Sequence, residues 1–184
     1  MKKILVIAGI LILIFLGGVL YVHHTKSFSP QSTVKFEGDG LKVQIVYCQP
    51  YKKGRIIFGP TSQALAPYGK VWRTGANEAT LFETNQDLKI SGKKLKAGIY
   101  SLWTIPGEQT WTVIFNSEHG QWGIHYNGEA NRDPKNDALT LEAQAQSTKD
   151  KVFEQFTITL EKVGEEMEMN LFWDKTLVAV PFSK

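Results

Sequence analysis

Cysteine is nearly absent from this sequence. Cys48 is the single cysteine among 184 residues, so no disulfide can form within the chain. The fold must therefore be stabilised by a hydrophobic core, and the chain is long enough to build one as a single domain. An apolar content of 42% with 21% charged residues is typical of a globular chain and argues against disorder.

Sequence motifs of several large enzyme classes are also absent. The chain has no G-x-S-x-G or G-x-G-x-x-G motif, and Gly69-Lys70 is followed by Val71 where a P-loop needs serine or threonine. His119 and His125 are separated by five residues, which is a weak match to the spacing of zinc ligands. We therefore expect no metal and no cofactor, and we assign no catalytic residue. Whether the protein is an enzyme stays open, with the absent motifs favouring a non-enzymatic role.

Acidic residues are missing from the first 26 residues, which contain Lys2, Lys3 and Lys26. The rest of the chain holds 18 basic and 18 acidic residues and is neutral overall. A neutral domain without a basic cluster has no general attraction to the phosphates of nucleic acids. We therefore expect no nucleic acid among the partners of this protein.

A long apolar run is present at the N-terminus. Residues 4–22 form 19 consecutive residues without a charge. As a helix this run is roughly 28 Å long, close to the ~30 Å hydrocarbon core of a bilayer. Lys2 and Lys3 precede it, so the positive-inside rule predicts that the N-terminus stays in the cytoplasm. The run therefore predicts a signal anchor in an inner membrane of the bacterial type, with the remaining chain in the periplasm.

This anchor divides the chain into four parts. We expect a cytoplasmic N-terminus at 1–3, a transmembrane helix at 4–22, a polar linker at 23–31 and an exported domain at 32–184. A cleaved signal peptide is the alternative, with a weak cleavage site before Phe28. Cleavage would leave a soluble periplasmic protein.

Apolar and polar residues alternate with a period of two along most of the exported domain. Turn residues such as Gly38-Asp39-Gly40 and Pro106-Gly107 separate the alternating segments. The pattern predicts an all-β fold, an antiparallel and jelly-roll-like β-sandwich of about nine or ten strands. Short helices are considered only at residues 61–66 and 143–152.

The segment 47–80 lacks clean alternation and concentrates basic, amide and aromatic side chains. Loops on a rigid β scaffold often carry function. We select six candidate ligand-binding residues: Arg55, Trp72, Arg73, Asn77, Glu78 and, at the edge, Trp122. Arg73 offers a fork of donors that suits a carboxylate or phosphate, and Trp72 offers a flat apolar wall. The structural alternative is that Arg73 pairs with Glu78 and stiffens the loop.

Residues 67–80, PYGKVWRTGANEAT, are the most specific part of a wider match to a known family. Further matching residues are Lys53-Gly54-Arg55, residues 97–102, residues 111–116 and Trp122-Gly123. On these residues the chain resembles domain-of-unknown-function family 2911, a family of exported bacterial proteins. The resemblance covers about residues 34–165. It implies an exported β domain, points again to residues 72–80, and supplies no reaction.

These features predict a membrane-anchored periplasmic module that binds a small ligand or an envelope component, or that has a structural role. Two other functions stay open. One is a hydrolase acting on an envelope polymer through Arg73, Asn77 and Glu78. The other is a protein-docking module, which would present an exposed apolar patch.

Overall fold

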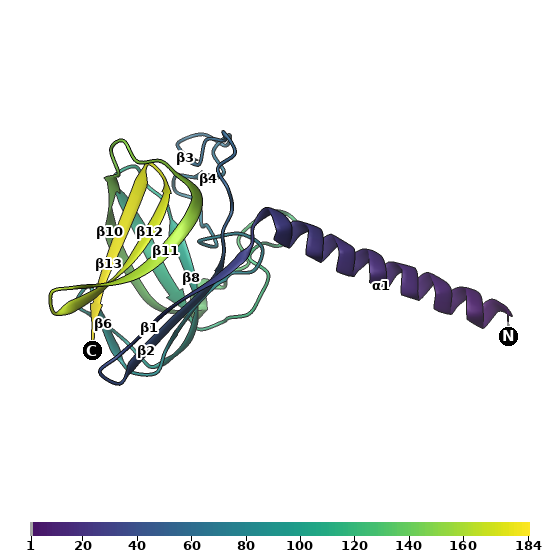
Figure 1. Cartoon of the computed structure of the whole chain (residues 1–184), viewed down its shortest axis with the longest axis horizontal. Coiled ribbons are helices and arrows are strands. Elements are labelled where there is room, and N and C mark those ends of the chain that lie inside the picture. Colours follow the sequence, from purple (N-terminus) through teal and green to yellow (C-terminus); the bar gives the residue numbers. More distant parts are fainter. Residues whose placement is uncertain (1) are drawn as a thin grey trace.

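A computed structural model describes residues 2–184 and shows one long helix attached to a β-rich domain (Figure 1). Helix α1 (Lys2–Phe28) projects away from the domain. Its stretch Ile7–Phe28 is long and apolar enough to cross a membrane, a property shared by membrane anchors and signal sequences. The structure therefore contains the predicted apolar helix without distinguishing between these two roles.

The predicted linker is for the most part helical. Helix α1 continues through residues 23–28, and β1 already begins at Gln31. No proline or glycine interrupts residues 23–28, so the apolar helix propagates through them. Pro30 ends it, because the residue before a proline is disfavoured in the α conformation. Ser29 and Pro30 alone connect α1 to the first strand.

Thirteen strands follow α1 in the described part of the chain, more than the nine or ten predicted. The additional ones are very short: four of them have only two or three residues. The strands are β1 (Gln31–Gly38), β2 (Leu41–Cys48), β3 (Phe58–Gly59), β4 (Ala66–Pro67), β5 (Thr80–Thr84), β6 (Leu88–Ile90), β7 (Lys93–Leu95), β8 (Gly98–Ile105), β9 (Thr110–Asn116), β10 (Asp137–Ser147), β11 (Phe153–Val163), β12 (Glu166–Asp174) and β13 (Thr176–Ser183).

The two short helices considered from the sequence are wrong. Residues 61–65 form turns that lead into β4, and residues 143–147 belong to β10. The short helix that the structure does contain is the 3₁₀ turn Pro134–Asn136, which has Asp133 as its N-cap. Proline in the first turn and an acidic N-cap favour such a turn, and this signal was present in the sequence.

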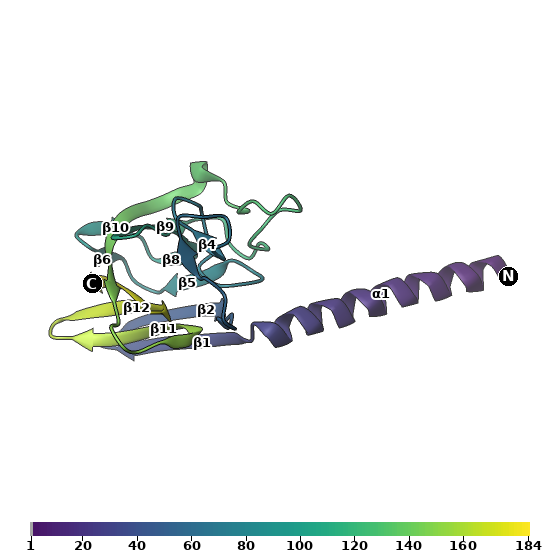
Figure 2. The same cartoon turned by 90° about the horizontal axis from the view of Figure 1, so that it is seen from above.

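Eleven of the strands form one antiparallel sheet in the order β1-β2-β5-β8-β9-β10-β13-β12-β11, with β6 and β7 attached beside β13. The all-β antiparallel prediction is therefore confirmed. The sheet folds over into two layers, with β1, β2, β11 and β12 in one and β5, β8, β9 and β10 in the other (Figure 2). Its two ends nearly meet, because the segment after β2 pairs with the start of β11 through Tyr51 and Gln155.

The main core lies between the two layers of the folded sheet. Inward-facing residues alternate along the strands, as in the burial of Leu41, Val43 and Ile45 along β2. At the end where the loops gather, this core contains a cluster of aromatic rings: Phe58, Trp72, Trp111, Phe156 and Trp173.

A smaller core lies on the outer face of β8 and β9. Trp103 of β8 and Ile114 of β9 pack there with Ala79, and Val71 and Ala130 cover them from the loops. These strands are therefore buried on both faces, and their burial no longer alternates. The loops at residues 70–79 and 117–136 thus form a layer of their own on the sheet, and this layer positions the candidate site.

Candidate functional site

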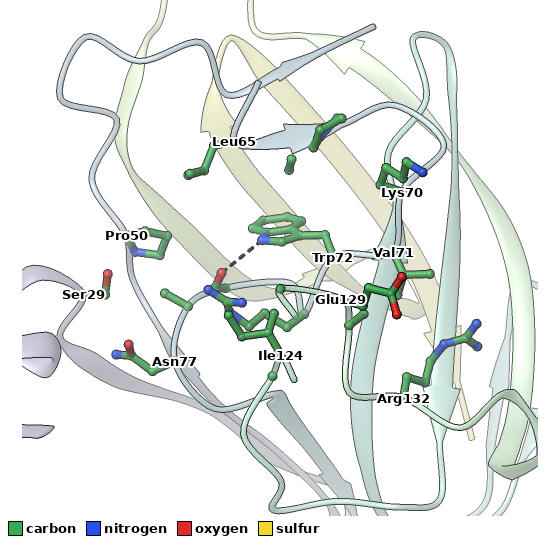
Figure 3. Close-up of a pocket in the computed structure, with 18 of the residues that line it drawn as sticks. Ser29, Pro50, Leu65, Lys70, Val71, Trp72, Asn77, Ile124, Glu129 and Arg132 are labelled. Atoms are coloured by element: carbon green, nitrogen blue, oxygen red, sulfur yellow. Dashed lines mark hydrogen bonds between the residues drawn. The ribbon is translucent and has the colours of Figure 1, made fainter. Parts of the chain in front are cut away.

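A cavity of about 1080 Å³ lies where three parts of the chain meet. Its walls come from the end of α1, the segment 50–77 and the loop 123–134. Figure 3 shows Trp72 in the middle, with Ser29, Pro50 and Asn77 on one side and Glu129 and Arg132 on the other. The basic side chains in the lining are Lys53, Arg55, Lys70, Arg73 and Arg132, and the acidic one is Glu129.

The loop from Arg73 to Asn77 is held in an unusual conformation. Thr74 and Asn77 both have positive φ angles, 52° and 60°. The left-handed region is costly for a β-branched residue such as threonine. Thr74 is fully buried, and its hydroxyl lies 3.1 Å from that of Thr104, while Thr80 donates a 2.7 Å hydrogen bond to its carbonyl oxygen. The surrounding contacts therefore hold this strained turn in place.

Arg73 extends from this turn across Gly123. A Cβ atom added at Gly123 would lie 2.0 Å from the Cδ atom of Arg73, so only glycine leaves room for the side chain. Gly123 is itself fixed by a 2.9 Å hydrogen bond from its N–H to the carbonyl oxygen of Asn77. The two loops thus lock together and set the path of the Arg73 side chain.

The Arg73 guanidinium has no counterion among the described residues. It forms no salt bridge, and its Nε atom is buried without a hydrogen-bond partner. Burial lowers the pKa of Arg73 below its ordinary value, an effect that the nearby Cys48 opposes. The amide nitrogen of Asn77 is likewise buried, and it faces the Cys48 thiol. Arg73 is thus the charged side chain of this turn that carries an unused buried donor.

Trp72 forms the apolar floor of the cavity. The side chain is 8% exposed and its Nε1 donates a 3.0 Å hydrogen bond to the carbonyl oxygen of Gly75, drawn in Figure 3. The ring stacks on Trp173 with centroids 5.6 Å apart and meets Phe156 edge-on at 5.0 Å. Trp72 therefore belongs to the core and lines the cavity as well.

Glu78 does not pair with Arg73, so the hypothesis of a stiffening pair between them is wrong. The Glu78 carboxylate lies 2.9 Å from the Lys26 Nζ atom in the last turn of α1 and accepts a hydrogen bond from the Cys48 thiol at 3.6 Å. Burial raises the pKa of Glu78, but the hydrogen bond and charge of Lys26 outweigh this and lower it below its ordinary value. The residue is not part of the cavity lining.

The remaining candidates are divided between the lining and its surroundings. Arg55 lines the cavity, and its guanidinium donates to the carbonyl oxygens of Tyr51 and Lys52. Trp122 is 39% exposed and lies outside the lining. Its backbone forms an isolated antiparallel β-bridge with that of Glu78. The structure thus brings Arg55, Trp72, Arg73 and Asn77 together around one cavity and leaves Glu78 and Trp122 beside it.

Four charged lining residues were not selected from the sequence: Lys53, Lys70, Glu129 and Arg132. Arg132 forms an ion pair with Asp137, and Glu129 accepts a hydrogen bond from Asn127. Lys53 and Lys70 stand in the segment that the sequence singled out, beside glycines at turns. Glu129 and Arg132 come from a loop whose approach to this segment depends on Gly123, and no spacing in the sequence indicated it.

The two loop histidines carry no metal-binding arrangement. His119 and His125 are both exposed. Across residues 2–184 as described, no group of three or more histidine, cysteine, aspartate or glutamate side chains is placed to hold a metal ion.

The comparisons with known proteins point to one family. A family model described as "Protein of unknown function (DUF2911)" matches residues 29–182, which is most of the chain and nearly the whole β domain. The resemblance seen in the sequence is therefore confirmed. Neither the curated proteins nor the solved structures gave a match to this chain.

Proposed function

The chain belongs to the DUF2911 family, and we propose that it binds a small anionic ligand in the cavity beside Trp72 and Arg73. In this proposal α1 anchors the protein in the inner membrane, and the β domain that binds the ligand lies in the periplasm. Lys2 and Lys3 before the apolar helix support this orientation, since basic residues stay on the cytoplasmic side. The function is one of recognition, at a site built on a rigid β scaffold.

The observation that carries the proposal is the unpaired guanidinium of Arg73. A charge that is taken from water without a counterion costs free energy, so proteins rarely retain one without use. Here the side chain is fixed against Gly123 and faces no carboxylate in the described structure. A carboxylate or phosphate in the cavity would supply the missing partner through paired hydrogen bonds.

The rest of the lining fits such a ligand. Lys53, Arg55 and Lys70 add positive charge at exposed positions, and Glu129 is the single acidic side chain among the lining residues. Trp72, Val71 and Ile124 supply apolar surface for the uncharged part of the ligand. An anion with a small apolar or sugar-like body therefore matches the cavity better than a neutral molecule.

The hydrolase alternative has less support. A general acid needs a carboxyl whose pKa is raised towards neutrality, and a general base must reach the substrate. The pKa of Glu78 is instead lowered, and the side chain is engaged by Lys26 outside the cavity lining. Arg73 and Asn77 alone offer donors that bind and polarise a ligand, which suits recognition.

The test is a binding screen of the full-length chain purified from membranes in a non-ionic detergent. An intact mass that includes α1 supports the anchor, and a mass beginning at Phe28 contradicts it. Probes are inorganic phosphate, glycerol 3-phosphate, citrate and uncharged N-acetylglucosamine, followed by thermal unfolding. A ligand present at 100 times its dissociation constant stabilises the protein by about 2.7 kcal/mol.

Arg73→Gln is expected to remove most of this shift for the anionic probes. The control is Lys89→Gln, because Lys89 is an exposed basic residue on β6 and is not part of the lining. Gly123→Ala should act like Arg73→Gln, since the new methyl group displaces the Arg73 side chain. Anion-induced shifts that survive in a folded Arg73→Gln variant would refute this placement of the site.

A further inference from the structure

The end of helix α1 is built into the wall of the cavity. Phe28, the last residue of α1, and the buried Ser29 both line it. The Lys53 Nζ atom lies 4.8 Å from the centre of the Phe28 ring, and Lys26 forms the ion pair with Glu78 described above. The distance from the membrane to the cavity is therefore set by the helix itself.

That distance is short. If residues 4–22 fill the hydrocarbon core, residues 23–28 continue the helix for about 9 Å beyond it at 1.5 Å per residue. The headgroup layer on each side of a bilayer is roughly 5–8 Å thick, the difference between the 30 Å core and the 40–45 Å of the whole bilayer. Phe28 then lies at the outer boundary of the headgroups, and the cavity opens beside them.

The loops around the cavity face the same way. In both views the loop 117–136 extends from the domain on the side from which α1 leaves (Figures 1 and 2). At the turn of this loop Tyr126 is fully exposed, and Trp122 before it is 39% exposed. Leu65 of the lining is also exposed. Exposed tyrosine and tryptophan are typical of protein surfaces at the level of the headgroups.

The charges at this face are complementary to anionic headgroups. Lys53, Arg55 and Lys70 stand exposed in the lining, and Arg73 lies deeper without a counterion. Basic residues close to an anionic membrane surface are attracted to it. The domain as a whole is neutral, whereas the lining holds five basic side chains and one acidic one, so the cavity is more positive than the domain on average.

We propose that the anion bound at Arg73 is the phosphate headgroup of a lipid in the membrane that holds α1. This inference rests on the proposed function and adds the source of the anion. The phosphate of such a lipid reaches the cavity from the membrane side, while the acyl chains of the lipid stay in the bilayer. Trp72, Val71 and Ile124 contact its glycerol portion, and Trp122 and Tyr126 hold the loop at the surface. A free phosphate compound has the same anionic group but gains nothing from this placement.

The experiment compares lipid and soluble anions on the full-length chain in one non-ionic detergent. The probes are dioctanoyl phosphatidylglycerol, zwitterionic dioctanoyl phosphatidylcholine, glycerol 3-phosphate and inorganic phosphate, with dissociation constants taken from tryptophan fluorescence. Phosphatidylglycerol is expected to bind at least tenfold more tightly than each of the others. Arg73→Gln should reduce this affinity at least tenfold, Tyr126→Ser should reduce it several-fold, and Lys89→Gln should leave it unchanged. Lys70→Gln, at an exposed position, replaces Arg73→Gln if the latter fails to fold.

The outcomes separate the two proposals. If glycerol 3-phosphate binds as tightly as phosphatidylglycerol and depends on Arg73, the lipid inference is overturned while the anion site stands. If phosphatidylcholine binds as tightly as phosphatidylglycerol, the headgroup charge plays no part and the inference fails. If no anionic probe binds, the proposed function fails with it.

Discussion

The interior of the folded sheet and the loop layer around the cavity satisfy their polar groups to different degrees. Between the sheet layers, apolar residues such as Ile45, Phe82 and Val180 are buried, and the backbone is paired along the strands. Of the buried side-chain nitrogen and oxygen atoms that lack a partner in the described structure, one, the Nε1 atom of Trp173, lies in this interior, and the others lie in the loop layer, with the charged Arg73 among them. Stability alone explains the first region. The second region retains a cost that an anionic ligand would remove.

Backbone strain follows the same division. Several residues other than glycine have positive φ angles, and Asp39, Ser91 and Asp174 sit in tight turns between neighbouring strands. Polar residues with short side chains tolerate that conformation in turns. Thr74 has no such reason: it is β-branched, buried and outside any hairpin. Backbone strain outside the tight turns of hairpins is more often found at binding sites than elsewhere.

Trp72 is where the two regions meet, and its removal should have the largest effect. It lies in a loop but packs on Trp173 and Phe156 like a strand residue. Trp72→Ala is therefore expected to destabilise the protein by about 3–5 kcal/mol, as Trp173→Ala should. Chemical denaturation of both variants in the same detergent measures this.

Trp122 provides the contrast to Trp72. It lies in the neighbouring loop and is 39% exposed, so Trp122→Ala should change the stability by about 0.5 kcal/mol or less. If Trp72→Ala were as mild as Trp122→Ala, the cavity floor would not be continuous with the core, and the two regions would be separate units.

Two arginines of the lining should respond to methionine with opposite signs. Arg73 has no counterion, so Arg73→Met removes an unsatisfied buried donor and should stabilise the unliganded protein by about 1 kcal/mol. Arg132 pairs with Asp137, so Arg132→Met leaves a carboxylate without its partner and should destabilise by about 1–3 kcal/mol. Thermal unfolding of both variants without added anions gives the comparison. Equal losses from both substitutions would mean that Arg73 is structural.

The sequence predicted the first region far better than the second. Period-two alternation reports directly which strand residues face a core, so the strand class followed from it, as the alternating burial along β2 illustrates. The folding of one sheet into two layers depends on pairings distant in sequence, such as that of β10 with both β9 and β13. Local patterns carry no information about such pairings.

The candidate site was predicted in part for a similar reason. The dense polar segment 47–80 pointed to Arg55, Trp72, Arg73 and Asn77, because it departs from the strand pattern. The partner of Glu78 was misassigned, since proximity in sequence favoured Arg73 over Lys26. Helix α1 continues to Phe28 and brings Lys26 to the domain. The sequence pattern predicted a polar linker at 23–31, and a linker prediction does not indicate this contact.

The pair between Lys26 and Glu78 should give the smallest effect, and its dependence on pH identifies it. Both side chains are more than a third exposed, so we expect at most about 0.5 kcal/mol from the pair at pH 7.

The pKa of Glu78 is lower in the folded protein than in the unfolded chain. Its contribution is therefore fully present above the unfolded value of about 4.3 and is lost as the pH falls through the folded value. The free energies of unfolding of the wild type and Glu78→Gln should differ at pH 7, and this difference should shrink as the pH falls below the unfolded value. Glu83→Gln, on the exposed side of β5, is the control and should show no such convergence, because Glu83 has no ion pair among the described residues. A difference for Glu78→Gln that does not shrink as the pH falls would mean that the carboxamide disturbs the packing against Cys48, and that the helix is held to the domain by contacts other than this pair.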